Sequence, residues 1–82
     1  MLSLNVKITN KSGLHLRPAA RIASIAEKAK SEVRIINGDK EADAKSAISM
    51  MLLACGQGAD ITVMIEELTD MDILHDIITV FN

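Results

Sequence analysis

The chain has 82 residues, enough for one small domain that buries roughly 60–65% of the surface exposed by its unfolded form. This size excludes a large enclosed cavity and favours a flat site that faces a partner. Nine basic residues stand against eleven acidic ones, the net charge is −2, and the one aromatic residue is a phenylalanine. Nucleic-acid binding, which favours a basic face and often stacking aromatics, is therefore not expected.

The single cysteine and the hydropathy pattern indicate in which cellular compartment the protein is expected. Cys55 permits no internal disulfide, and no Cys/His set has the spacing of metal ligands, so we expect a reducing compartment and no structural metal. Cys55 is predicted to be a small packed residue. The N-terminus has no basic region before an apolar core, and no apolar run approaches membrane-spanning length. These features predict a cytoplasmic protein without direct membrane insertion.

The first half of the chain alternates strand and helix patterns. Apolar residues at every second position from Leu2 to Ile8 predict a strand with one buried face. Residues 10–13 predict a turn, and Val33 and Ile35 predict a second short strand. Asn37-Gly38 predicts a tight hairpin before a polar edge strand over residues 40–43. Between the first two strands, helical spacing predicts a buried stripe of Ala19, Ile22, Ala23, Ile25, Ala26 and Ala29.

The second half adds a helix, a strand and a last helix. Ser46 is predicted to cap a helix over residues 47–54, which Gly56 and Gly58 end. Residues 61–65 alternate as a further strand, and Thr69 is predicted to cap the last helix. The buried stripe expected for that helix consists of Met71, Leu74, Ile77, Ile78 and Phe81. The element order β-α-β-β-α-β-α predicts a two-layer α+β domain over residues 1–82, with one sheet face beneath its helices.

A candidate reactive site lies where the first strand pattern gives way to the first helix. Pro18 is well tolerated in a helix's first turn, because the N–H that proline lacks has no intrahelical partner there. The remaining free N–H groups and the positive end of the helix dipole form an anion site, to which Arg17 adds a fixed charge. His15 precedes this helix start and is a nucleophile near neutral pH. The combination predicts a phosphohistidine.

Four groups of residues give the chain a resemblance to a known family. They are Ile8-Thr9-Asn10, Gly13-Leu14-His15 with Arg17-Pro18-Ala19, Lys45-Ser46, and Gly56-Gln57-Gly58. In this joint spacing the chain resembles the phosphocarrier protein HPr family of the bacterial phosphoenolpyruvate-dependent sugar phosphotransferase system. The resemblance implies an open-faced sandwich in which a four-stranded antiparallel sheet, in the order 1-4-2-3, carries three helices on one face. Patterning alone does not choose that strand order.

The resemblance also implies a function. His15 would accept a phosphoryl group from enzyme I and pass it to the IIA component of a sugar permease. Arg17 would stabilise the phosphate, which would also contact the helix start at Pro18 and Ala19. The chain would act as a monomeric substrate of its partners rather than as an enzyme, and it would need no cofactor. His75, in the middle of the last helix, has no ligand partner at helical spacing and is expected to be an ordinary surface residue.

The resemblance further implies a docking surface and a regulatory site. The residues expected to face protein partners are Leu16, Ala20, Ala47, Ile48 and Met51, whereas Met50 and Leu53 are expected to point into the core. Ser46 is the expected site of regulatory phosphorylation, with an HPr kinase/phosphorylase and a transcriptional regulator as its partners. A methionine-containing surface adapts to several partners.

Three departures from the family pattern leave the choice of partner open. Leu16 replaces a residue that is often small or hydroxylated, Ser24 and Glu27 stand where some members have basic residues, and Ala47 is smaller than usual. One alternative is a carrier of the nitrogen-related regulatory branch of the phosphotransferase system. Another is a mainly regulatory binding module that acts through phosphorylated Ser46, although His15 speaks against it. The sequence does not reveal the sugar.

Overall fold

The computed structural model describes residues 2–81, so the first and last residues of the predicted domain lie outside the described residues. Its elements are β1 (Leu2–Lys7), α1 (Leu16–Ala26), β2 (Val33–Asn37), β3 (Lys40–Asp43), α2 (Ala47–Met51), β4 (Asp60–Ile65), the 3₁₀ turn η1 (Leu68–Asp70) and α3 (Met71–Val80). No helix within these residues is both long enough and apolar enough to cross a bilayer.

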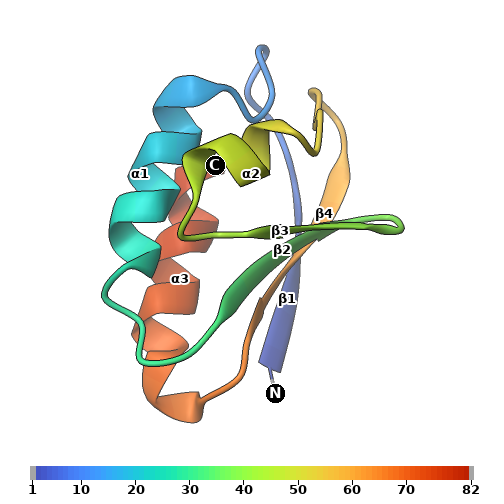
Figure 1. Ribbon diagram of the computed structural model, residues 1–82. Helices are drawn as coiled ribbons and strands as arrows, with labels where there is room; N and C mark the ends of the chain where they lie inside the picture. Colours follow the sequence, from blue (N-terminus) through green and yellow to red (C-terminus); the bar gives the residue numbers. More distant parts are fainter. Residues whose placement is uncertain (1, 82) are drawn as a thin grey trace.

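The four strands form one antiparallel sheet in the order β1-β4-β2-β3, which confirms the expected topology. Figure 1 shows the helices gathered on one side of the sheet and the other side left open. The polar strand β3 lies at one edge, as predicted, with the predicted bounds.

The core lies between the helices and the inward face of the sheet. Alternate residues of the central strands point to the helices and are fully buried, and each such Ile or Val contributes roughly 1.5–3 kcal/mol relative to an exposed side chain. Helix α1 packs against both α2 and α3, so its position sets the position of the other two. The residues that meet in this layer include Ile61, Val63, Ile65, Val33, Ile35, Ala19, Ile22, Ala26, Leu74 and Ile77.

Strand β1 is less buried than its alternation predicts. Ile8, just beyond the strand, is buried, but Leu2 and Val6 are half-buried and Leu4 is 41% exposed. Leu4 pairs with Val63 and points to the helical side of the sheet. Because β1 is an edge strand that lies away from the helices (Figure 1), its apolar side has little cover.

The β2–β3 hairpin turns one residue later than predicted. Asn37 still pairs with Lys40, so the two central residues are Gly38 and Asp39 instead of Asn37 and Gly38. Gly38 has a φ of +65°, whereas Asp39 has a negative φ. A positive φ at the first central position alone is the pattern of a type II′ turn, which favours glycine there.

Helix α2 is shorter than predicted and ends at Met51 rather than at Ala54. Ala54 adopts a φ of +53°, the only positive φ of a non-glycine residue within residues 2–81. The left-handed conformation that usually falls to a glycine at a helix end is therefore taken by alanine, two residues before Gly56.

The prediction that Thr69 caps the last helix is wrong. Residues 68–70 form the turn η1, and Asp70 is the residue before α3, with no side-chain bond to that helix. Its carboxylate, only 2% exposed, accepts bonds from the N–H of Lys30 (3.0 Å) and from the N–H (3.2 Å) and hydroxyl (3.0 Å) of Ser31. Asp70 thus fastens the start of α3 to the loop after α1.

Met71 was predicted to be buried, but it is the first residue of α3 and its exposed fraction is 36%.

Replacement of Asp70 by asparagine should make stability less dependent on pH. The backbone N–H of Lys30, assisted by Ser31, lowers the pKa of Asp70. This contribution to stability is fully present above the unfolded pKa of about 3.9 and is lost as the pH falls through the lower folded value. Urea unfolding should therefore show Asp70→Asn to be less stable than the wild type near neutral pH, with a gap that narrows on acidification.

The control for this measurement is Asp76→Asn, which removes an exposed carboxylate of α3 that accepts no hydrogen bond within residues 2–81. It should reproduce the pH profile of the wild type. A constant gap between Asp70→Asn and the wild type at every pH would contradict the assignment.

Candidate functional site

His15 is the residue immediately before α1, and its side chain is exposed. Its backbone is extended (φ −104°, ψ −170°), and its N–H donates to the carbonyl of Gly13 at 3.2 Å. The imidazole makes no capping bond to the helix and no other hydrogen bond within residues 2–81. A ring nitrogen is therefore available to a reactant from solvent.

The free backbone donors lie beside His15, two residues earlier than the expected contact at Pro18 and Ala19. Pro18 has no N–H, and the N–H of Ala19 donates to the carbonyl of His15 at 3.0 Å as the first bond of the helix. In the described chain, no hydrogen bond uses the N–H of Leu16 or Arg17. These two groups and the helix dipole favour an anion at this end of α1.

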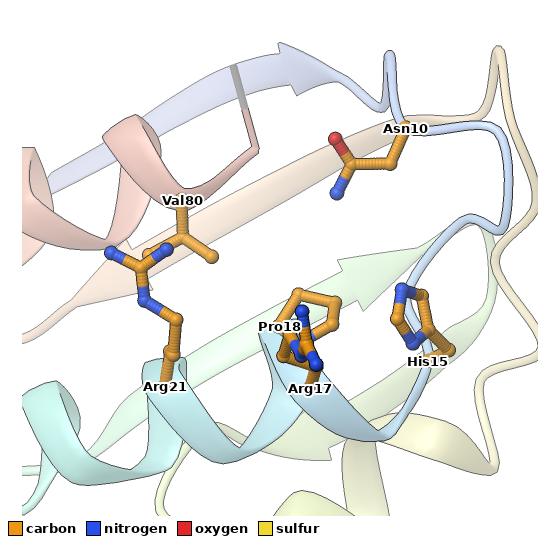
Figure 2. A pocket seen from close by; sticks show the side chains of 6 residues that line it. All are labelled: Asn10, His15, Arg17, Pro18, Arg21 and Val80. Atoms are coloured by element: carbon orange, nitrogen blue, oxygen red, sulfur yellow. The ribbon is translucent and has the colours of Figure 1, made fainter.

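A hollow of about 270 Å³ opens beside the imidazole (Figure 2). Its lining residues are Asn10, His15, Arg17, Pro18, Arg21 and Val80. His15 and Arg17, the two residues of the predicted reactive site, both line it. Sequence analysis missed Asn10, Arg21 and Val80. The spacing of four residues between Arg17 and Arg21 was a signal that could have placed both on one helix face. Nothing in the sequence places Val80, from the last helix, beside them.

Gly13 fixes the loop that carries His15. The N–H of Leu14 donates to the carbonyl of Cys55 at 3.0 Å, so the loop before α1 is bound to the loop after α2. Gly13 has a φ of +66°, and a Cβ atom at this position would lie 2.2 Å from the Cys55 carbonyl oxygen. Only glycine, which has no Cβ atom, can adopt this φ and lie this close to the Cys55 backbone. Cys55 is buried, as predicted, and burial raises the pKa of its thiol.

Comparison with known proteins places this geometry in a family. The family model described as "PTS HPr component phosphorylation site" matches residues 2–82. The chain belongs to the HPr family. It is 41% identical over 63 residues to phosphocarrier protein HPr of Buchnera aphidicola (77% of this chain, 74% of the relative). It is 38% identical over 63 residues to phosphocarrier protein NPr of Shewanella violacea (77% and 69%).

A solved structure agrees with this assignment. The histidine-containing phosphocarrier protein of a Mycoplasma superposes with a TM-score of 0.90 at 30% identity, covering 96% of this chain and 90% of that one. The family and these relatives make the chain a phosphocarrier of the phosphotransferase system.

An exposed apolar surface lies over α1 and α2. In this chain the exposed fractions are 62% for Leu16, 74% for Ile48 and 41% for Met51. Ala20 is exposed, Ala47 is half-buried, and Met50 and Leu53 are buried as expected. Leu52, which sequence analysis did not place in this set, is 75% exposed. The bond from the Leu14 N–H to the Cys55 carbonyl holds the loop after α2 beside the loop that carries His15.

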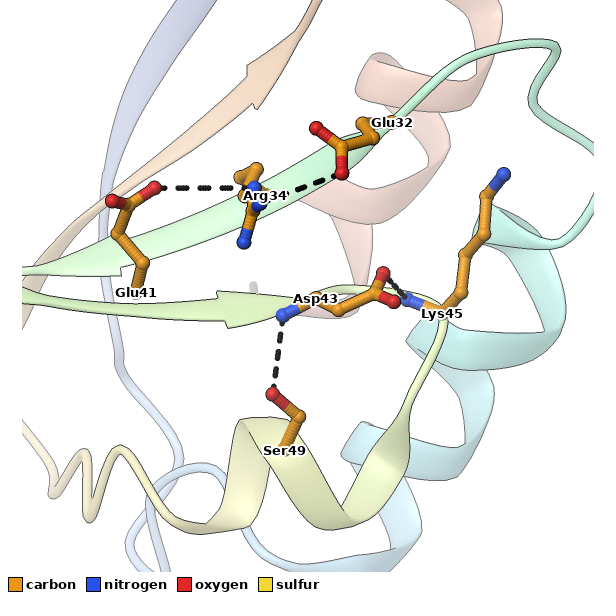
Figure 3. A network of polar contacts seen from close by, with 6 residues as sticks. All are labelled: Glu32, Arg34, Glu41, Asp43, Lys45 and Ser49. Atoms are coloured by element: carbon orange, nitrogen blue, oxygen red, sulfur yellow. Dashed lines mark hydrogen bonds and ion pairs between the residues drawn. The ribbon is translucent and has the colours of Figure 1, made fainter.

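Ser46 caps α2, as predicted, because its hydroxyl accepts the N–H of Ser49 at 3.2 Å. Around it, Asp43 fastens the helix start to β3. The Asp43 N–H donates to the Ser49 hydroxyl (3.1 Å), and the Asp43 carboxylate accepts the N–H of Lys45 (2.9 Å), as Figure 3 shows. The Asp43 carbonyl also accepts the N–H of Ser46 at 3.0 Å.

Replacement of Gly13 by alanine should destabilise the fold by at least about 2 kcal/mol, because it combines a positive φ with overpacking against Cys55. Gly38→Ala is the matched control, since Gly38 has a φ of +65° but nothing within 4 Å of its added Cβ. Urea unfolding should show the smaller loss for Gly38→Ala, roughly 1 kcal/mol. Equal losses would mean that the Gly13–Cys55 approach is not a constraint.

Proposed function

We propose that this phosphocarrier accepts a phosphoryl group on His15 from phospho-enzyme I and passes it to a IIA component of a sugar phosphotransferase system. The observation that supports the proposal is the exposed imidazole at the head of α1, beside two unused N–H groups and the Arg17 guanidinium. A nucleophile, an anion site and a route from solvent are thus combined at one place.

In the proposed transfer, one ring nitrogen of His15 acts as the nucleophile. The lone pair of a neutral His15 ring nitrogen forms a bond to phosphorus while the phosphorus–nitrogen bond to the donor histidine breaks, and that histidine keeps the bonding electron pair. Transfer to the IIA component reverses these roles. At an exposed helix end the backbone donors of α1 stabilise the phosphoryl oxygens by about 0.3–1 kcal/mol, and the Arg17 charge adds to this contribution. Stabilisation of this size orients the group without trapping it.

The exposed apolar surface of α1 and α2 supplies the docking area for enzyme I and for IIA components. We assign Leu16, Ala20, Ala47, Ile48 and Met51 to it, and add Leu52 because of its exposure. Large apolar side chains around a reactive centre are typical of partner-facing surfaces. We also propose that residues 1–82 form one carrier domain that works as a monomer in the cytoplasm, with its partners supplying the catalytic groups.

The nitrogen-related branch of the phosphotransferase system is the second candidate. Relatives named HPr and NPr match the chain at similar identity, 41% and 38%. Both candidates use the same chemistry at His15 and differ in their partner proteins. Rates of transfer from the phosphorylated chain to IIA components of the two branches would separate them.

Regulation at Ser46 is a further part of the proposal, with a kinase/phosphorylase and a transcriptional regulator as partners. Ser46 is half-buried and lies within two helical turns of Ile48 and Met51. A phosphate there would carry about −1.5 to −2 charges at the rim of the docking surface. A rim charge changes the rate and the selectivity of association more than it changes the fold. A mainly regulatory module without phosphotransfer is the weaker alternative, because it leaves the His15 site without a use.

Incubation with enzyme I and phosphoenolpyruvate should add one acid-labile phosphoryl group to the wild-type chain, detected by mass measurement. His15→Ala should accept none, whereas His75→Ala, which removes the other histidine, should be phosphorylated like the wild type. Arg17→Ala should keep the wild-type melting temperature and transfer roughly tenfold more slowly or worse, because it loses a charged donor to the phosphate. Full incorporation into His15→Ala would refute the function.

Ser46→Asp should slow phosphorylation of His15 by enzyme I without lowering the melting temperature. Asp and Asn are both good N-cap residues, so Ser46→Asn is the matched control that keeps the cap and adds no charge. Ser46→Asn should transfer at the wild-type rate, and Ser46→Ala should lose roughly 1 kcal/mol of stability through the missing cap. Earlier melting of Ser46→Asp with unchanged transfer kinetics would contradict both halves of the argument.

A further inference from the structure

Arg21 lines the same hollow as His15 and Arg17, but the transfer chemistry described above makes no use of it. It lies one helical turn after Arg17, and residues four apart on a helix share a face. In Figure 2 the Arg21 guanidinium lies across the hollow from the imidazole, on the side of Val80. In this view the Arg17 side chain overlaps Pro18 and lies between Arg21 and His15.

The two arginines form an uncompensated pair of like charges. Every ion pair within residues 2–81 involves Lys7 or Arg34, and none involves Arg17 or Arg21. Like charges four residues apart destabilise a helix. Among residues 2–81, no acidic side chain lines the hollow. An anion between the two guanidinium groups would remove this repulsion, and planar guanidinium groups match phosphate oxygens well.

The hollow also has room for such an anion. Its volume of about 270 Å³ is several times the share of one water molecule in the liquid, about 30 Å³. A phosphoryl group bonded to His15 would enter it from one side. Its oxygens would then face the arginines rather than bulk solvent alone.

We propose that Arg21 is a second phosphate-contacting residue, which holds the phosphoryl group of phospho-His15 together with Arg17. The inference rests on the proposed function, since it concerns the same phosphorylated state. The competing role for Arg21 is an electrostatic contact with an acidic surface of a partner. The two roles differ in their effect on the equilibrium constant for phosphorylation of the chain. A contact with the phosphoryl group stabilises the phosphorylated chain itself, whereas a contact with the partner changes only the rates.

The first test is the equilibrium constant for phosphorylation by phosphoenolpyruvate, with enzyme I as the catalyst and pyruvate present. A catalyst cannot change this constant, so a residue that only docks enzyme I leaves it unaltered. Arg21→Gln should lower the phosphorylated fraction, with an equilibrium constant reduced roughly two- to tenfold, as expected for an exposed charged contact. The equilibrium constant of Arg21→Lys should lie between those of the wild type and Arg21→Gln, because lysine keeps the positive charge but lacks the planar guanidinium group.

Lys28→Gln is the matched control, since Lys28 is an exposed cation just beyond α1 that does not line the hollow. It should give the wild-type equilibrium constant. An unchanged constant for Arg21→Gln, with or without slower transfer from enzyme I, overturns the inference and leaves the carrier function intact.

The second test needs no protein donor. Phosphoramidate transfers its phosphoryl group to histidine as its phosphorus–nitrogen bond breaks and ammonia leaves. In a His75→Ala background, His15 is the only imidazole left. The side-chain N–H resonance of Arg21 in NMR spectra should shift on phosphorylation, together with that of Arg17. A shift of Arg17 alone overturns the inference, and failure of both donors to phosphorylate His15 refutes the proposed function as well.

Discussion

The contact between the Gly13 loop and the Cys55 carbonyl is the constraint on which the rest of the site depends. It joins the loop before α1 to the loop after α2, through a bond of 3.0 Å from the Leu14 N–H and through van der Waals approach at Gly13. The same contact therefore orients His15 at the helix head and holds the end of α2 next to it. The proposed reactive group and the proposed docking surface are linked by one backbone interaction, which explains how so small a domain could present both.

The charges of the chain are divided between paired and unpaired sites in a way that its net charge of −2 does not reveal. On the open face of the sheet, Arg34 lies between Glu32 (3.4 Å) and Glu41 (3.9 Å), as Figure 3 shows, and exposed pairs of this kind contribute about 0–1 kcal/mol. At the helix head, Arg17 and Arg21 have no such partner within residues 2–81. Two cations without a printed acidic partner thus stand on adjacent turns of α1, where an anion would bind.

Sequence periodicity predicted the elements whose burial is decided locally, and missed the features that depend on distant contacts. Ile61, Val63 and Ile65 alternate and are buried because β4 is central, whereas the same alternation in β1 leaves Leu4 exposed at an edge. Asp70 directly precedes α3, but the residues that donate hydrogen bonds to its carboxylate lie some forty residues earlier in the chain. His15 and Arg17 were predictable because a helix start has a local signature. Val80 and the hollow were not, because they need the packing of α3 beside α1.

The openness of the hollow has a consequence for a carrier that must give up what it accepts. A buried phosphate site would bind the group through strong charged bonds, because a low dielectric magnifies each of them. Here the histidine and both arginines are exposed, and solvent weakens every contact they make. Several weak donors, distributed over two backbone N–H groups and the side chains of α1, can orient a phosphoryl group without a deep energy minimum. A carrier between two partners needs this balance, because excess stability on His15 would oppose the second transfer as much as it favoured the first.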